Sequence, residues 1–149
     1  MLRHAAAAFA AATVLVLGAR RAEAQSDWTP PSRQMPAMPE MAALDGDWQS
    51  ALGSWIAGVE AVAGVAPGAL RARAETTAGN PRAKLVRFTA GMRPVVVWSD
   101  RNGDGRCDML EIYRGGTAVV QMLDPDFDGQ GNVVRLYDGG GSLAKETRL

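Results

Sequence analysis

An internal repeat of 24 residues constrains the fold of this chain more than any other feature of its sequence. When the sequence is shifted along itself by this distance, three segments align without a gap, and each ends in glycine: residues 85–91, 109–115 and 133–139. A second apolar stretch follows each of the first two glycines, and a more polar stretch follows the third. Strand, turn and strand at a fixed period are typical of tandem β-hairpins. The sequence therefore predicts three loop-plus-hairpin units, at residues 76–99, 100–123 and 124–149.

Apolar and charged side chains alternate within the first strand of each unit. Successive side chains of a strand point to opposite faces of a sheet, so one face of these strands can be buried. The residues expected on the buried face are Val86, Phe88, Leu110, Ile112, Val134 and Leu136. Those expected on the opposite face are Arg87, Glu111 and Arg135.

A helical period of apolar residues precedes the repeats. Trp48, Leu52, Trp55 and Val59 recur at steps of three and four, which predicts an amphipathic helix over residues 45–66. Its tryptophan-rich face suits packing on a sheet, and a partner-binding surface is the alternative. The expected fold class is α+β: one amphipathic helix packed on a small antiparallel sheet built from about three tandem loop-plus-hairpin units, in a single domain over residues 45–149.

The first 44 residues are expected to lie outside that domain. Residues 1–24 have a basic start, an apolar run and small residues before a cleavage point after Ala24, which predicts a signal peptide and an exported protein, periplasmic or secreted. The apolar run is too short for a membrane span. Residues 25–44 are rich in proline and methionine, which favours a flexible segment. Its methionines at every third position, Met35, Met38 and Met41, are soft ligands, so Cu(I) binding is an alternative to a plain linker.

Composition excludes several classes of function. Cleavage after Ala24 leaves 13 basic and 15 acidic residues, without the basic footprint of a nucleic-acid-binding protein. It also removes His4, the only histidine, and with it Ser-His-Asp catalysis and histidine metal sites. Cys107 is the only cysteine, which rules out an internal disulfide and favours a packing role over a redox role. No catalytic residues are therefore predicted.

Residues 100–111 carry oxygen-bearing side chains at a spacing that suits calcium. Ca²⁺ takes six to eight oxygen ligands, which a twelve-residue loop supplies from positions 1, 3, 5, 9 and 12 and from the backbone carbonyl of position 7. Gly105, at position 6, permits the sharp turn. The same residue types also build ordinary exposed turns, which is the alternative. The candidate ligands are Asp100, Asn102, Asp104, Arg106 through its carbonyl, Asp108 and Glu111.

This pattern resembles the EF-hand calcium-binding loop, over these twelve residues and Ile112 only. Helices flank the loop in that family, whereas strand-like segments 94–98 and 111–113 flank it here. The flanks look more like those of exported bacterial repeat proteins in which Asp- and Gly-rich calcium loops alternate with short strands. The resemblance implies bound Ca²⁺, without the groove opening of calcium sensors.

The next unit contains a partial copy of the loop, and the preceding unit has lost it. The partial copy keeps positions 1, 3, 5, 6 and 9 but has Arg135 at position 12, where a positive charge opposes binding. It is expected to be a possible weak second metal site, formed by Asp124, Asp126, Asp128, Gln130 and Asn132.

Together these features predict an exported, non-enzymatic protein that holds a structural Ca²⁺ and binds neither nucleic acid nor, after signal cleavage, a membrane. The alternatives are a partner-binding or adhesive β-repeat module, with an unidentified protein partner at an open sheet edge, and a hydrolase that uses paired carboxylates.

Overall fold

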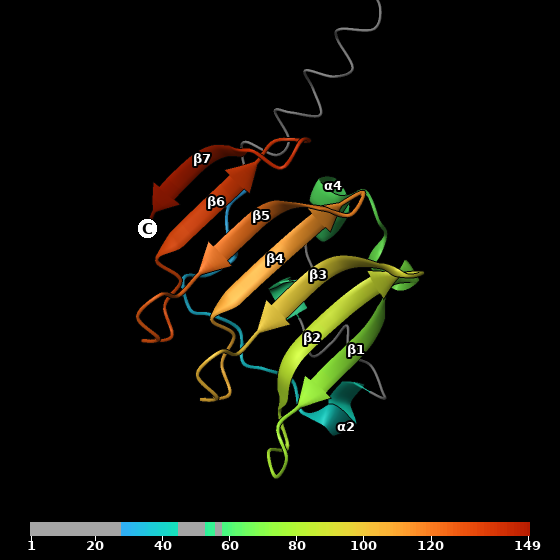
Figure 1. Ribbon diagram of the computed structural model, residues 1–149, viewed down its shortest axis with the longest axis vertical. Helices are drawn as coiled ribbons and strands as arrows, with labels where there is room; N and C mark the ends of the chain where they lie inside the picture. The colour runs from blue at the N-terminus through green and yellow to red at the C-terminus, as the bar shows by residue number, and fades with distance from the viewer. Residues whose placement is uncertain (1–27, 45–52, 56–57) are drawn as a thin grey trace, which may run out of the picture.

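The structure, a computed structural model, describes residues 28–44, 53–55 and 58–149. Seven strands form one antiparallel sheet in which each strand pairs with the one before it in the sequence (Figure 1). The strands are β1 (Arg71–Thr76), β2 (Ala83–Ala90), β3 (Arg93–Ser99), β4 (Met109–Arg114), β5 (Thr117–Leu123), β6 (Val133–Tyr137) and β7 (Leu143–Arg148). The helical segments are short: α2 (Met41–Leu44), the 3₁₀ turns η1 (Gly53–Trp55) and η2 (Pro67–Ala69), and α4 (Val59–Ala63).

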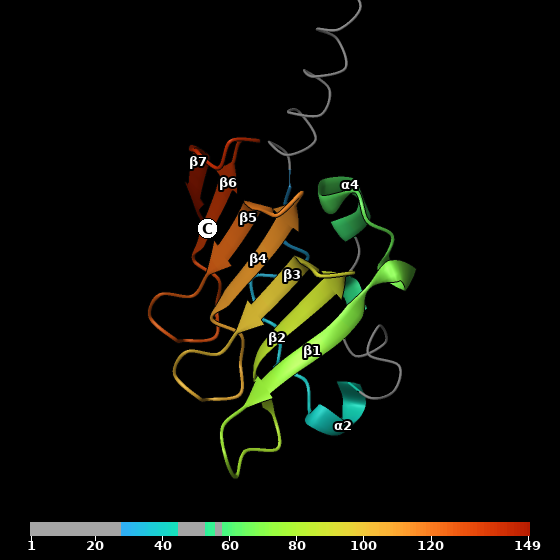
Figure 2. The same ribbon diagram turned by 45° about the vertical axis from the view of Figure 1, so that its right-hand side comes forward.

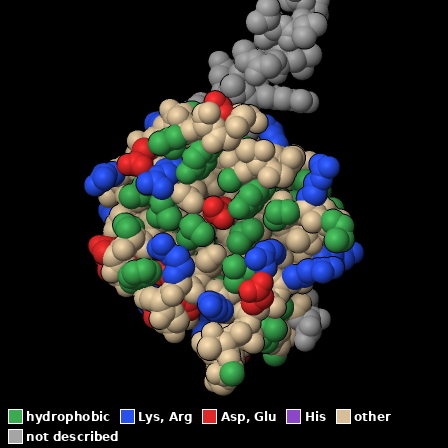
Figure 3. Space-filling view, viewed as in Figure 1, with side chains coloured by type: hydrophobic (Ala, Val, Ile, Leu, Met, Phe, Trp, Pro, Cys, Tyr) green, Lys and Arg blue, Asp and Glu red, His purple; other side chains and the backbone are tan. Residues whose placement is uncertain are grey.

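One face of the sheet carries the core. The apolar residues of the alternating pattern in β2, β4 and β6 are buried there, together with Trp98 from β3 and Met122 from β5. The helical segments and residues 28–44 lie on this same side of the sheet (Figure 2). The other face is a mixture of apolar and charged side chains open to solvent (Figure 3).

The predicted α+β class is wrong, because the sheet dominates and, within the described residues, no long helix packs on it. Of the helix expected over residues 45–66, residues 45–52 and 56–57 lie outside the described residues; the rest forms only η1 and the five-residue α4. Gly58 and Gly64, at φ 86° and 72°, are left-handed and bound α4 on both sides. An α-helix cannot continue through that conformation. The sheet also exceeds three hairpins, because β1 adds a strand before the first of them.

Residues 33–41, which we call the strap, run across the loops at one end of the sheet. The strap forms isolated antiparallel bridges with all three loops that open a repeat unit: Gln34 with Gln130, Ala37 with Arg106, and Glu40 with Arg82. Each bridge consists of two backbone hydrogen bonds. In the middle bridge, the Met38 amide donates to the Gly105 carbonyl at 2.9 Å, and the Cys107 amide donates to the Pro36 carbonyl at 2.9 Å.

Successive bridges lie three residues apart in the strap and 24 residues apart in the repeats, which the strap crosses in reverse order. The length of three strap residues matches the spacing of the loops. Three residues of extended chain span about 9–10 Å, which is also the width of two neighbouring strands. Each triplet uses the methionine amide as donor and the carbonyl two residues earlier as acceptor. Pro36 and Pro39 therefore accept hydrogen bonds through their carbonyls at positions where no amide donor is needed.

This placement differs from the flexible linker that the sequence predicts for residues 25–44. Met35 and Met38 are 2% and 0% exposed and belong to the core, whereas Met41 is 37% exposed. Arg82 also donates from Nη1 to the Met38 carbonyl at 2.8 Å. The described part of this segment is therefore a component of the folded domain.

Candidate metal centre

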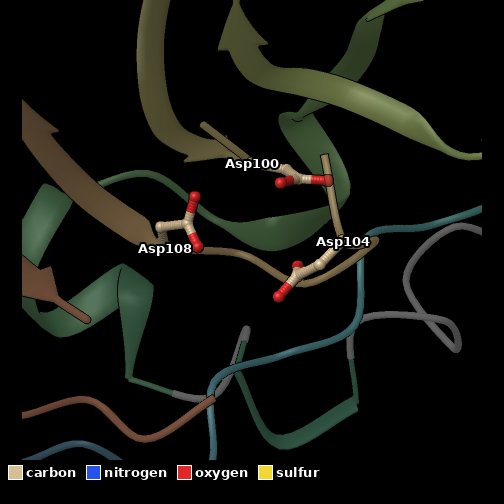
Figure 4. Close-up of side chains that lie close together, drawn as sticks. All are labelled: Asp100, Asp104 and Asp108. Atoms are coloured by element: carbon tan, nitrogen blue, oxygen red, sulfur yellow. The ribbon is translucent and has the colours of Figure 1, made fainter. Parts of the chain in front are cut away.

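The loop between β3 and β4 brings together three of the predicted ligands. Ser99 and Met109 pair at the ends of these strands, and the Asp108 amide donates to the Ser99 carbonyl at 2.7 Å. This pairing holds Asp100 and Asp108, eight residues apart in sequence, at neighbouring strand ends. Figure 4 shows their carboxylates and that of Asp104 around a common centre. One ligand oxygen from each lies within 4.8 Å of the others.

Backbone amides orient these carboxylates. The Gly103 and Gly105 amides donate to the two oxygens of Asp100 at 2.7 and 2.9 Å. The Arg106 amide donates to Asp104 at 2.9 Å, and the Arg101 amide donates to Asp108. An ionised carboxylate has about four acceptor sites, so these bonds leave capacity for a cation. The backbone of the loop therefore fixes the orientation of these carboxylates.

The electrostatics of the loop favour a cation. Asp100 and Asp108 are 3% and 1% exposed, although both are acidic. Burial raises the pKa of the Asp108 carboxyl, the nearby Asp100 and Asp104 raise it further, and the two backbone amides that bond it act in the opposite direction. A bound divalent cation would offset both the lost hydration and the mutual repulsion of the carboxylates. Arg101, whose Nε lies 4.0 Å from Asp108, offsets only part of the charge.

Asn102, a fourth predicted ligand, lies beside the cluster. The Asn102 side chain bonds Asp104, donating from Nδ2 at 3.3 Å and accepting from the Asp104 amide at 3.2 Å. Arg106 bridges to the strap, but the hydrogen bonds of that bridge use Gly105 and Cys107. The Arg106 carbonyl is thus not used by the strap.

Glu111 is not brought to the cluster. It lies on β4, and its carboxylate accepts hydrogen bonds from the Tyr113 hydroxyl and from Gln121 Nε2, both at 3.0 Å. If a helix followed Asp108, a residue three positions later would point back toward the loop. On a strand, Glu111 lies on the face opposite the buried Leu110 and Ile112.

The second loop, between β5 and β6, holds another acidic cluster, formed by Asp124, Asp126 and Asp128. Asn132 donates from Nδ2 to Asp126 at 2.9 Å. Gln130 contributes its backbone amide to Asp128 at 2.7 Å. The structure therefore gathers the predicted residues of this loop as well.

Cys107 lies between the first cluster and the strap. It is fully buried, its thiol donates to the Met109 carbonyl at 3.1 Å, and burial raises its pKa to about 12. This environment disfavours the thiolate and fits the expected packing role.

Thiol labelling is expected to report opening of this loop. At pH 8 a pKa near 12 in place of 9.0 lowers the thiolate fraction roughly a thousandfold, and burial blocks access besides. A chromogenic disulfide reagent should therefore label the native chain far more slowly than the chain in concentrated urea. Equal rates with and without urea would show that Cys107 is not buried in solution.

Sequence reasoning missed the strap, although the three-residue spacing of its methionines was a signal for it. It also gave no reason to expect a hollow of about 300 Å³ beside Trp55 and Trp98, lined otherwise by Ser32, Gln34, Met35, Pro36 and Ala37. No carboxylate lies among these lining residues within the described part of the chain.

Within the described ranges, no helix is long and apolar enough to cross a membrane. The predicted signal peptide, residues 1–24, lies outside the described residues. Comparison of the chain with models of protein families, with curated proteins and with solved structures finds no match.

Proposed function

We propose that this chain is an exported, non-catalytic protein that binds a structural Ca²⁺ in the loop between β3 and β4. One observation carries the proposal: the carboxylates of Asp100, Asp104 and Asp108 converge within 4.8 Å, and two of these residues are buried. Ca²⁺ prefers such oxygen ligands and tolerates irregular geometry. The proposed ligands are these carboxylates, the Asn102 side chain and the Arg106 carbonyl, with water in the remaining positions.

The ion would stabilise the fold through the elements it joins. The loop connects β3 to β4, and the Gly105 carbonyl and Cys107 amide of the same loop bond the strap. A cation that holds the loop therefore favours both the central strands and the strap. A structural role requires only that the site is filled, and it does not require a response to changing calcium concentration. This fits the Kd of about 10⁻⁴ to 10⁻³ M common among extracellular modules.

Calcium is expected to raise the thermal stability of the chain. At about 10 mM calcium, a site with a Kd of about 10⁻⁴ M adds roughly 2.7 kcal/mol to the free energy of unfolding, or a Tm increase of roughly 5–15 °C. The measurement is thermal unfolding in calcium and in EGTA, with a calorimetric calcium isotherm.

Variants of the loop sharpen this test. Asp100→Asn with Asp104→Asn should remove the first-loop component of the isotherm, because two ligand charges are lost. Glu111→Gln is the matched control, and it should leave the isotherm intact because Glu111 faces away. A Tm that ignores calcium and EGTA alike, or an isotherm unchanged in the double variant, would refute the proposal.

The edge of the sheet favours a second function that is compatible with the first. Every side chain of β7 is exposed, Leu143 to 53%, and among the described strands β7 pairs only with β6. An unpaired edge can accept a strand from a partner. The adhesive or partner-binding alternative therefore predicts self-association or partner capture; a calcium-independent monomer at high concentration in size-exclusion chromatography counts against self-association.

A further inference from the structure

The first and second loops are built alike. Gly105 donates to Asp100 Oδ2 at 2.9 Å, and Gly129, 24 residues later, donates to Asp124 Oδ2 at 2.8 Å. The amide that follows each of these glycines donates to an aspartate, Asp104 in the first loop and Asp128 in the second. The sequence ranks the second loop lower only because Arg135 replaces glutamate at position 12.

Position 12 does not distinguish the loops in this fold. Glu111 and Arg135 both pair with Gln121 across neighbouring strands, on the face of the sheet away from the core. Arg135 donates from Nε to Glu146 at 2.8 Å. Its charge is therefore engaged on that face, and its position removes the reason to regard the second loop as degraded.

The second loop has a buried carboxylate oxygen that no donor of the described residues satisfies. Asp124 is 1% exposed, and its Oδ1 has no hydrogen-bond partner among residues 28–44, 53–55 and 58–149. In the first loop the equivalent oxygen accepts from the Gly103 amide. Phe127 stands at that position in the second loop, with φ at 60° and its ring facing the Arg101 guanidinium at 5.2 Å. An unsatisfied buried anion is costly, so this oxygen indicates a position at which a cation would bind.

Within the described part of the chain, no ion pair with Asp124 supplies that charge. One oxygen of each of Asp124, Asp126 and Asp128 lies within 4.8 Å of the others. No salt bridge within the described part of the chain involves any of the three. The hydrogen bond from Arg101 Nη2 to Asp124 goes to the backbone carbonyl of Asp124, at 3.4 Å.

We infer that the second loop is a hard-cation site in its own right, in which Asp124 Oδ1, Asp126 and Asp128 bind a divalent cation of the calcium type. This inference deepens the proposed function and rests on it for the identity of the ion. The chain then binds two ions, and position 12 contributes to neither site. The Asp124 amide also donates to the Asp108 carbonyl at 2.8 Å, so the two sites are joined by one backbone hydrogen bond.

Native mass spectrometry and calorimetry of the full chain with calcium test this inference. The wild type should bind two ions, and Asp124→Asn should bind one, because a neutral amide of the same shape replaces the ligand. Asp126→Asn with Asp128→Asn is the second variant; both residues are exposed, so the fold should tolerate it. It should weaken the second site roughly tenfold or more. Arg135→Gln is the control and should change neither stoichiometry nor affinity.

The outcomes separate this inference from the proposed function. One ion in the wild type, lost in Asp100→Asn with Asp104→Asn and retained in Asp124→Asn, overturns the second site and keeps the first. One ion lost only in Asp124→Asn supports the second site and overturns the first. Binding of no ion overturns both. A gain in affinity on Arg135→Glu would overturn the conclusion that position 12 faces away from the loop.

Discussion

Replacing Met38 by alanine should lower the free energy of unfolding by about 2–5 kcal/mol. Met38 is fully buried in the core cluster, so truncation removes apolar contacts and leaves a cavity. Met41, three residues later and 37% exposed, is the matched control; Met41→Ala should change the free energy by about 0.5 kcal/mol or less. The measurement is urea unfolding of both variants, in EGTA and in saturating calcium.

The comparison decides whether the strap belongs to the folded domain. A flexible linker predicts the same small effect for both variants. If Met38→Ala costs no more than Met41→Ala, the strap is not docked in solution, and its six backbone hydrogen bonds to the loops do not contribute to stability. A large effect of Met38→Ala alone supports the docked strap.

Replacing Phe88 by alanine should cost about 3–5 kcal/mol. Phe88 is fully buried on the inner face of β2, and its ring meets that of Trp98 edge to face at 5.8 Å, with the planes at 76°. Truncation therefore removes both area and an aromatic pair. Equilibrium unfolding followed by tryptophan fluorescence measures the loss.

Phe127 provides the control for this substitution. It is 40% exposed, and its ring contacts the Arg101 guanidinium, an interaction of about 0.5–1 kcal/mol at exposed sites. Phe127→Ala should therefore cost about 1 kcal/mol or less. Equal losses at the two positions would contradict the placement of the core on the inner face of the sheet.

The strand faces and the grouping of the loop aspartates agree with the sequence because both depend on residues close together in the chain. Alternation at period two placed Val86 and Phe88 on the buried face and Arg87 on the other, because successive side chains of any strand diverge. The loop residues Asp100, Asp104 and Asp108 came together because the residues between the paired strands return the chain to its starting point. Both results follow from neighbours in the sequence, so a single chain suffices to predict them.

The prediction of a helix over residues 45–66 was wrong for a reason that the spacing of apolar residues does not reveal. Apolar spacing is compatible with a helix over residues 45–66, but it ignores backbone conformation at glycine. Gly58 adopts a left-handed φ at almost no steric cost and separates η1 from α4. Propensity alone could not decide whether this glycine would be tolerated within a helix or would interrupt it.

From the sequence alone came the repeat, the alternating faces of the strands and the acidic loops, since each depends on residues close together in the chain. Only the tertiary structure decided the place of the strap, because Gln34 meets Gln130 through backbone groups that carry no side-chain signature. It also decided which acidic residues lie close together. Glu111 has the spacing of a ligand, but the strand that leaves the loop carries it to the far face, where Tyr113 and Gln121 bond it.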